Sequence, residues 1–365
     1  MGSLISCLRD IQYSTLDEPS SQISSEVSYF PSPLRNIGTN CYLNSVLQAI
    51  SSSSAFVDGI VQLHENYGSL EKLEFFTDLI QNIHSGNQNL KDISKHQIFK
   101  NWNKSGQQDC FELLSYVLNQ VYSEIRKYKE TMNEIETKNL LEWLNQSLPM
   151  RIIVSYTIRC ECGNLVDVPL HSELALHVPI ISDKKQPIEL QSLVDQFLGD
   201  NEITNYECYS NKCIKTKALR ETKLVKPLPN TICLHLQRTF WNGKTMKKID
   251  KIVNFNEKLI IKSDFCKFAE TENLDLFVRN YVETIIETSV KAIQNDCEVY
   301  GDEYRLTSFI VHRGSVKGGH YVCYKSMRNR WFLTNDNQVK PVELHKILNC
   351  QAYLLFYEKV EKNEK

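Results

Sequence analysis

The chain has 365 residues, of which 42% are hydrophobic and 24% are charged, and its formal net charge is −2. A chain of this length and composition can bury a large core, in two or three subdomains packed as one globular unit. The balanced charge, and the lack of a basic stripe interleaved with aromatic residues, argue against a protein that binds nucleic acid. No apolar run approaches the roughly 18 to 20 residues that cross a bilayer.

The first seven residues carry a lipidation pattern. Residues 1–6 read Met-Gly-Ser-Leu-Ile-Ser, which matches the N-myristoylation motif on Gly2, and Cys7 could accept a palmitoyl chain as a second anchor. Stable membrane attachment requires two such anchors. The pattern is short and also occurs as the remnant of an expression tag, so peripheral membrane association and an unmodified N-terminus both stay open.

The cysteines indicate the compartment. Twelve are present, most of them isolated along the chain, and the N-terminus does not resemble a secretory signal peptide. We therefore expect a reducing, cytoplasmic setting in which most thiols are buried, one is reactive and a few bind a metal.

The order of the predicted elements divides the chain into segments. Residues 1–33 are polar and contain prolines, which predicts a flexible segment before a folded domain over 34–358 and a charged tail over 359–365. Helical periodicity predicts helices at 41–52, 56–66, 70–85, 93–101 and from about 107, within a helical unit over 34–145. Strands of an antiparallel sheet are expected at 151–159, 164–170, 173–179, 219–225 and 230–238. We also expect a helix near 190–198, an inserted amphipathic helix over 272–295, and final strands from Tyr304 to Asp336.

The helix that begins at Cys41 is the most informative stretch. The apolar residues from Tyr42 to Ile50 fall on one helical face, Thr39 and Asn40 suit the cap, and Gly38 permits a tight entry. The macrodipole and the free N–H groups at a helix N-terminus favour a thiolate there. Cys41 is therefore either a nucleophile or a small buried residue of an ordinary core helix.

His320 is the candidate base. Gly318 and Gly319 precede it at the start of a predicted strand and allow a close backbone approach, where a substrate chain could pass. His235 lies in an alternating strand and His312 precedes a turn without the double glycine, so both have poorer settings than His320.

A third group is expected beside this imidazole. The strand that starts at Trp331 returns after a turn, which can place Asn335 or Asp336 next to His320. Such a residue holds the imidazole in the tautomer and orientation that take the proton of the Cys41 thiol.

Together these motifs resemble the ubiquitin-specific protease family, papain-like cysteine peptidases with thumb, palm and fingers subdomains. The resemblance covers about residues 33–358. It rests on the blocks Asn36 to Ser45, Gln107 to Glu112, Gly319 to Tyr321, Trp331 to Asp336 and Ala352 to Tyr357. It implies an α+β papain-like fold with a helical thumb over about 34–145 and β-rich fingers and palm over about 146–358.

The resemblance also implies residue roles. Cys41 would be the nucleophile, His320 the general base and Asn335 the residue that orients the imidazole, while Asp336 can substitute or assist. Asn36 matches the side chain that donates to the oxyanion beside the backbone N–H of Cys41. No cofactor takes part in this chemistry.

Substrate contacts follow from the same resemblance. Gln108, Asp109 and Glu112 match positions where the family meets the basic C-terminal tail of ubiquitin, and Gly318 and Gly319 lie beside that tail. Carboxylates in a groove favour an arginine-bearing tail. The alternative is that Asp109 only caps a helix and that Glu112 is a solvated surface residue.

The fingers of the family often hold a structural zinc between two Cys-x-x-Cys knuckles. The candidates here are Cys160, Cys162, Cys208 and Cys213. The first spacing is one residue short and the second is two residues long. A tetrahedral zinc site and a decayed site held only by packing both stay open.

The resemblance therefore predicts a thiol-dependent deubiquitinase that hydrolyses isopeptide or peptide bonds after the C-terminal Gly of ubiquitin, with ubiquitin and ubiquitinated proteins as partners. Two alternatives remain. The chain could be a catalytically weak ubiquitin-binding scaffold, or a protease for a different ubiquitin-like modifier, because Asp109 and Glu112 cannot distinguish related basic tails.

Overall fold

The computed structural model describes residues 30–68, 70–87, 90, 97–100, 102, 108–129, 131, 150–180, 187–210, 213–267, 301–315 and 318–361. Gly2, Cys7, the helix expected over 272–295 and the last four residues of the expected tail lie outside these ranges, and those expectations stay predictions. The compact unit that carries the described elements begins at Pro31. Within the described ranges, no helix is both long and apolar enough to cross a membrane.

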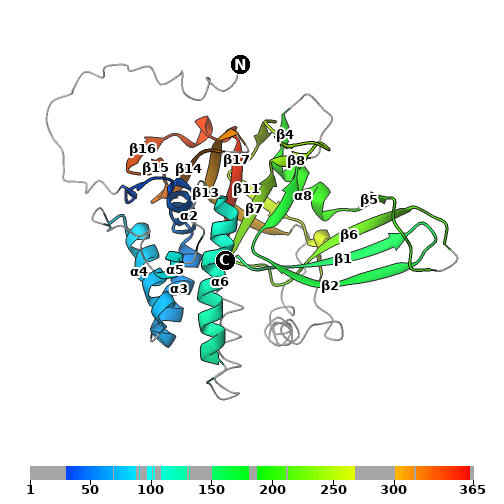
Figure 1. The fold of residues 1–365 in the computed structure, drawn as a ribbon, viewed down its shortest axis with the longest axis horizontal. Coiled ribbons are helices and arrows are strands. Elements are labelled where there is room, and N and C mark those ends of the chain that lie inside the picture. Colours follow the sequence, from blue (N-terminus) through cyan, green and yellow to red (C-terminus); the bar gives the residue numbers. More distant parts are fainter. Residues whose placement is uncertain are drawn as a thin grey trace. The chain divides into compact units, whose positions relative to one another are not determined.

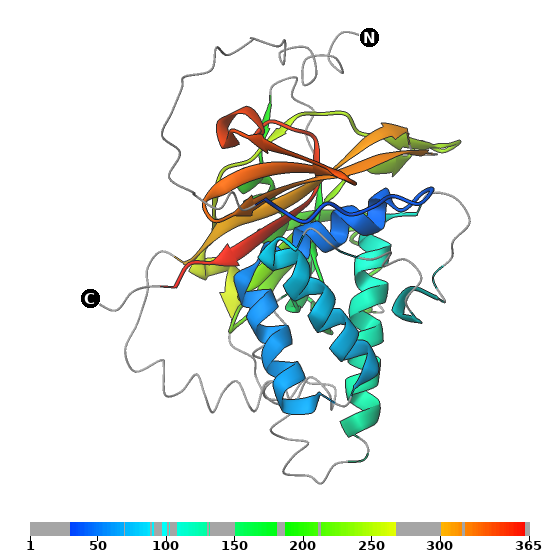
Figure 2. The same cartoon turned by 90° about the vertical axis from the view of Figure 1, so that its left-hand side faces the viewer.

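The helical unit is arranged around one buried helix. Its members are α2 (Cys41–Ile50), α3 (Ser54–Tyr67), α4 (Glu71–Ser85), α5 (Gln97–Lys100) and α6 (Cys110–Lys129). Every residue of α2 is buried, because α4 and α6 contact it on one side and the sheet contacts it on the other. Figure 2 shows these helices, in blue and cyan, against one face of the orange and red strands.

A large sheet, which we call the palm sheet, covers α2. Its strands, in spatial order, are β16 (Gln338–Val342), β15 (Arg330–Asn335), β14 (Gly318–Met327), β13 (Asp302–Ser315), β17 (Ala352–Lys359), β7 (Thr231–Gln237) and β3 (Leu176–Pro179), with β11 (Lys258–Ile261) also paired to β13. The final strands expected from Tyr304 to Asp336 were incomplete, because β16 and β17 follow them and β17 lies in the middle of the sheet.

The expectation of an antiparallel sheet is wrong at one edge of the palm sheet, and β12 (Cys266–Lys267) also pairs in parallel, with β6 (Lys217–Val225). Strand β3 pairs with β7 in parallel. A parallel pair needs a long crossover between its strands, and here the chain leaves the palm sheet after β3 and returns to it only at β7.

That excursion contributes two strands to a second sheet, the finger sheet, whose other strands lie before β3 and after β7 in the chain (Figure 1). Its strands are β12 (Cys266–Lys267), β6 (Lys217–Val225), β1 (Ile152–Cys160) and β2 (Leu165–Glu173), with β5 (Asn201–Thr204) paired to β6. The smaller elements are β4 (Ile188–Glu189) with β10 (Val253–Asn254), β8 (Thr239–Trp241) with β9 (Met246–Lys248), helix α8 (Leu190–Leu198) and the 3₁₀ turns η1 (Ser263–Phe265) and η3 (Leu344–Lys346).

The palm sheet separates two hydrophobic cores. In β14, Tyr321 and Cys323 pack into the core shared with the helices, whereas Val322 and Tyr324 pack into the core on the opposite face. Successive side chains of a strand point to opposite faces, so both faces of this strand are covered. The strand that follows His320 is therefore held from both sides.

Candidate active site

Cys41 is the first residue of α2 and is 4% exposed. Gly38 has φ +102, the left-handed backbone that the expected tight entry requires. Asn40 is the N-cap residue, but its side chain makes no capping hydrogen bond, so the expectation of a side-chain cap is wrong for Asn40. Its backbone N–H donates instead to Asn36 Oδ1 at 3.0 Å. The positive end of the helix dipole thus lies at Cys41 without a side-chain cap from Asn40.

His320 lies between the thiol and an amide. Its Nε2 is 2.6 Å from Asn335 Oδ1, and an amide oxygen can only accept, so Nε2 carries a hydrogen and Nδ1 is left for the thiol. A side-chain hydrogen bond with Cys41 is the main cause that raises the pKa of His320 to about 9, and burial opposes it. Asn335 and the charge of Asp336 raise this pKa further. The imidazole is therefore basic enough to accept the proton of the Cys41 thiol.

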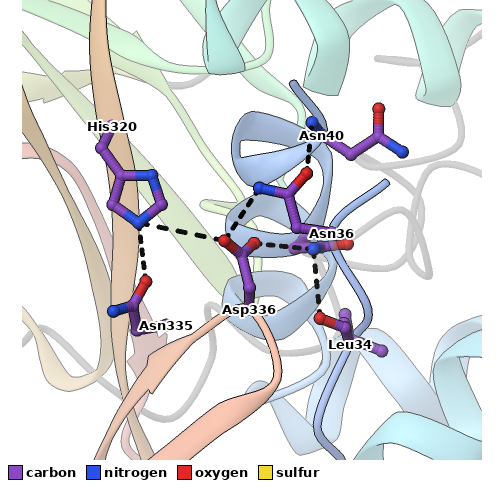
Figure 3. A network of polar contacts seen from close by, with 7 residues as sticks. Leu34, Asn36, Asn40, His320, Asn335 and Asp336 are labelled. Atoms are coloured by element: carbon purple, nitrogen blue, oxygen red, sulfur yellow. Dashed lines mark hydrogen bonds and ion pairs between the residues drawn. The ribbon is translucent and has the colours of Figure 1, made fainter. Parts of the chain in front are cut away.

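Asp336, which follows β15, contacts α2 and the segment that precedes it (Figure 3). Its Oδ2 accepts a hydrogen bond from Asn36 Nδ2 at 2.9 Å and its Oδ1 accepts one from Asn44 Nδ2 at 2.8 Å. Oδ2 also lies 3.9 Å from His320 Nε2. The backbone N–H of Leu34 donates to the carbonyl of Asp336 at 3.0 Å. This carboxylate therefore holds the segment before α2, the helix itself and the end of β15 together.

Asn36 is fixed through both of its amide atoms. Its Oδ1 accepts a hydrogen bond from the backbone N–H of Asn40, and one of its two Nδ2 hydrogens is donated in a hydrogen bond to Asp336 Oδ2. The second hydrogen of Nδ2 is the one that the predicted oxyanion contact needs, and that role stays a prediction. Asn36, His320, Asn335 and Asp336 line one pocket. Asn44 was missed as a site residue, because in the sequence it reads only as a polar position of α2.

Asp109 does cap a helix. Its Oδ1 accepts from the backbone N–H groups of Phe111 at 2.8 Å and Glu112 at 3.1 Å, at the start of α6. Its Oδ2 accepts from the hydroxyl of Tyr353 at 2.5 Å. A carboxylate has about four acceptor positions, so the cap leaves capacity for a basic tail. Glu112 is exposed and Gln108 is half-buried, and their contacts to a substrate stay predictions.

The two histidines that the sequence places below His320 as candidate bases, His235 and His312, are neutral at pH 7. His235 Nδ1 lies 2.9 Å from His177 Nδ1, and burial lowers the pKa of His235 to about 4. The ring of His312 stacks on Tyr321, with centroids 4.5 Å apart, and burial lowers the pKa of His312 to about 4. Both are therefore weaker proton acceptors than His320, whose pKa is raised to about 9.

The glycine before His320 has a structural reason. A Cβ on Gly319 would lie 2.2 Å from the carbonyl oxygen of Arg313 and 2.5 Å from His312 Nε2. Gly319 also faces Gly314, whose φ is +125, in the register of β13 and β14. The hairpin itself thus requires Gly319, whereas the expected passage of a substrate beside Gly318 and Gly319 stays a prediction.

The four finger cysteines meet at the end of the finger sheet. Cys160 Sγ lies 3.6 Å from Cys213 Sγ, Cys162 Sγ lies 3.7 Å from Cys208 Sγ, and all four sulfurs lie within 4.8 Å of one another. Zinc bound at 2.3 Å in a tetrahedron places its sulfurs about 3.8 Å apart. The residues therefore fit a Cys₄ metal site, despite their irregular spacings, because their sulfurs lie at about these distances.

Nearby donors also suit thiolates. The backbone N–H of Lys215 donates to Cys213 Sγ at 3.4 Å, and Asn164 Nδ2 donates to Cys208 Sγ at 3.7 Å. Gly163, with φ +89, closes the turn that carries the first pair. Such outer hydrogen bonds orient metal ligands and stabilise their charge.

The comparisons with known proteins cover almost the whole folded unit. The family model for ubiquitin carboxyl-terminal hydrolase matches residues 33–357. Ubiquitin carboxyl-terminal hydrolase 8 of Saccharomyces cerevisiae is 24% identical over 355 residues, 89% of this chain and 70% of that protein. A Schizosaccharomyces pombe protein named Probable ubiquitin carboxyl-terminal hydrolase 8 is 30% identical over 169 residues, 46% of this chain. The chain spans 30% of that protein's length.

Solved structures agree on the fold. The SAGA Ubp8/Sgf11/Sus1/Sgf73 DUB module bound to ubiquitin aldehyde contains a chain that matches with a TM-score of 0.64 at 22% identity, over 91% of this chain and 70% of that chain. The predicted α+β papain-like fold of the ubiquitin-specific protease type is confirmed. With the family model matching from residue 33 to residue 357, the chain belongs to the ubiquitin carboxyl-terminal hydrolase family.

Proposed function

We propose that the chain is a thiol-dependent deubiquitinase that hydrolyses the isopeptide or peptide bond after the C-terminal Gly of ubiquitin. The observation that carries this proposal is the position of His320, whose Nε2 lies 2.6 Å from Asn335 Oδ1 and whose pKa is raised chiefly by the side chain of Cys41. This is the arrangement of nucleophile, base and orienting group that thiol acyl transfer requires.

The first half of the reaction forms an acyl-enzyme. His320 takes the proton of the Cys41 thiol, and the sulfur attacks the carbonyl carbon of the terminal Gly. The C–N bond then breaks, the amine leaves with the proton from His320, and a thioester joins the modifier to Cys41.

The second half regenerates the enzyme. His320 takes a proton from water, and the hydroxide attacks the thioester carbonyl. The C–S bond breaks and the modifier leaves as a carboxylate, while Cys41 and His320 return to the hydrogen-bonded pair. Asn335 keeps the imidazole in the same tautomer throughout, because its Oδ1 accepts from Nε2.

The oxyanion that forms in both steps would be stabilised by hydrogen-bond donors at and just before the start of α2. The backbone N–H of Cys41 and the second Nδ2 hydrogen of Asn36 are the proposed donors, and Asp336 holds the Asn36 amide in place. Groups that are fixed before the reaction lose little energy in reorganising when the negative charge develops.

The tail of the modifier would bind between Asp109 and Glu112 on α6 and the glycines that precede His320. Carboxylates at the start of a helix attract arginine and lysine side chains of such a tail. The relative in the SAGA module has been solved bound to ubiquitin aldehyde and to monoubiquitin. This supports ubiquitin, and ubiquitinated proteins, as the partners of this chain.

We further propose that Cys160, Cys162, Cys208 and Cys213 hold a structural zinc. Zinc would cross-link the ends of two finger turns and take no part in the hydrolysis. Metal analysis by mass spectrometry should find one zinc per chain. Cys208→Ser should abolish it, and a metal-free protein with wild-type finger stability would contradict the proposal.

A panel of activity probes tests the activity and the modifier together. Ubiquitin with a vinyl-type electrophile at its C-terminus should label the wild-type chain but not Cys41→Ala, whereas probes built on other ubiquitin-like modifiers should label it more slowly. Preferential labelling by another modifier would support the second alternative. Binding of ubiquitin without labelling would support a scaffold that lacks catalysis.

A further inference from the structure

A lysine is buried at the junction between the helix that carries Cys41 and the strand that carries His320. Lys325 of β14 is 1% exposed, and its Nζ donates to Gln48 Oε1 at 3.2 Å and to Ser51 Oγ at 2.9 Å. Within the described residues, no carboxylate lies within ion-pair distance of this ammonium. Burying a cation among neutral groups is costly, so its position needs a reason.

A second buried polar residue reaches the same turn of α2. Ser308 of β13 is opposite Lys325 in the sheet register, is fully buried, and donates from its Oγ to the carbonyl oxygen of Ala49 at 2.9 Å. Ser51 in turn donates from its own Oγ to the carbonyl oxygen of Gln48 at 3.0 Å. We call Ser308, Lys325, Gln48 and Ser51 the helix dock.

The charge of the dock suits the end of the helix that it holds. The last turn of α2 contains no basic residue, and the C-terminal end of a helix carries a negative partial charge. Lys325 supplies the complementary charge from another element. Burial lowers the pKa of Lys325 to about 8, so the side chain stays mainly protonated at neutral pH.

The dock and the catalytic pair lie at opposite ends of the same two elements. Ser51 follows Cys41 by about 15 Å of helix, and Lys325 follows His320 by about 17 Å of strand. Helix α2 packs on β14. Because the two lengths are similar, Cys41 faces His320 at one end while Ser51 faces Lys325 at the other. A slip of α2 along β14 would therefore move the thiol relative to the imidazole.

We propose that Lys325 is a positioning residue for catalysis. By holding the C-terminal turn of α2 on the β13–β14 hairpin, it sets the position of the Cys41 thiol relative to the His320 imidazole. A misplacement of about 1 Å can reduce turnover about 10²-fold, so a tie at the far end of the helix has kinetic consequences. This inference rests on the thiol chemistry proposed above.

Lys325→Met tests the proposal, because it keeps the apolar stem of the side chain and removes the ammonium. In the full chain, we expect kcat on a fluorogenic ubiquitin substrate to fall about tenfold, with little change in KM. Alkylation of Cys41 by iodoacetamide should slow at neutral pH, and its pH profile should change, because the thiol is no longer held in place against the imidazole.

Ser51→Ala is the milder second variant, since it removes one acceptor of the ammonium and keeps the core volume. It should give a smaller loss in the same two measurements, and combining it with Lys325→Met should add little, because both changes act through one dock. If Lys325→Met does not fold, Ser51→Ala decides alone. A wild-type kcat and alkylation profile in Ser51→Ala would then overturn the proposal.

Leu259→Ala, in the core on the other face of the palm sheet, is the matched control for lost stability. At the same decrease in thermal midpoint it should leave the alkylation profile unchanged. If it reproduces the effect of Lys325→Met, the dock only stabilises the fold and the proposal is wrong. Alkylation needs no ubiquitin, so a wild-type chain that is inert toward ubiquitin would contradict the proposed function and leave the test of Lys325 intact.

Discussion

The catalytic junction and the cysteine cluster of the fingers are both assembled from residues far apart in the sequence, yet they are supported differently. At the junction, α2 is buried along its whole length and is tied at its start to Asp336 and at its end to Lys325. At the cluster, Cys162 is exposed, and the neighbouring Tyr209 and Ile214 are 80% and 92% exposed. Packing can hold the first region without a ligand, whereas the second is more exposed and is the place where we propose a structural zinc.

The largest expected effect tests whether the junction is preformed. Cys41→Ala should reduce turnover of a fluorogenic ubiquitin substrate about 10⁶-fold, because no other group can form the thioester. The thermal midpoint and the affinity for ubiquitin should stay close to those of the wild type. Measurable turnover that a thiol reagent still blocks would assign the nucleophile to another cysteine.

The oxyanion donor should have the next largest effect. Asn36→Ala should lower kcat about 10²- to 10³-fold, the usual cost of losing one such donor. Asn40→Ala is the matched control, because the Asn40 side chain makes no capping bond and its backbone N–H remains. Equal losses in both variants would show that the segment before α2, and not the Asn36 amide, is responsible.

The cluster should respond to changes that leave the junction unaffected. Asn164→Ala removes the hydrogen bond to Cys208 Sγ and should weaken metal affinity about 10- to 100-fold. Competition with a chelator measures this. The rate of Cys41 alkylation should not change, since the cluster lies outside the catalytic network. A slower alkylation would show that the two regions are coupled.

The smallest expected effect is a shift in pH dependence. The pKa of His320 is raised to about 9, and the imidazolium that protonates the leaving amine is lost above that value, so kcat/KM should fall as the pH rises through it. The stability that His320 contributes is complete below its unfolded pKa of about 6.5 and is lost as the pH rises through about 9. Asn335→Ala should move both alkaline limits to lower pH, because the Asn335 hydrogen bond is one cause of the raised value. Unmoved limits would mean that Cys41 and Asp336 raise the pKa without a contribution from Asn335.

Local patterns were sufficient to predict the helices and the catalytic motifs. The apolar period after Cys41 predicts α2, and the turn before Trp331 predicts the β14–β15 hairpin, since both depend on neighbours in the sequence. The same hairpin indicated Asn335 or Asp336 as the group beside His320. The role of Asn36 came only from the resemblance to a family, because no local pattern connects residues about 300 positions apart. The four cysteines were candidates because of the family's zinc knuckles; the structure brings their sulfurs together, and the bound metal stays a proposal.

Long-range polar contacts could not be predicted. Lys325 reads as a surface residue in the sequence, because lysines are seldom fully buried, and only the packing of α2 on β14 reveals its acceptors. Asp109 illustrates a different limit, since a helix cap and a substrate contact call for the same carboxylate at the same position. The central place of β17 was also missed, because an apolar run does not reveal which strands it will join.

The place of β17 has a consequence for the order of folding. This strand lies between β13 and β7, so neither of them has its partner on that side until residues 352–359 have left the ribosome. The β13–β14–β15 hairpins can form earlier, because their contacts are local, but the two halves of the palm sheet meet only through β17. Cys41 is synthesised early, but we expect the His320 imidazole to take a fixed position opposite it only after β17 has been synthesised. A nascent chain would then be unable to cleave its substrate until synthesis of the domain is nearly complete.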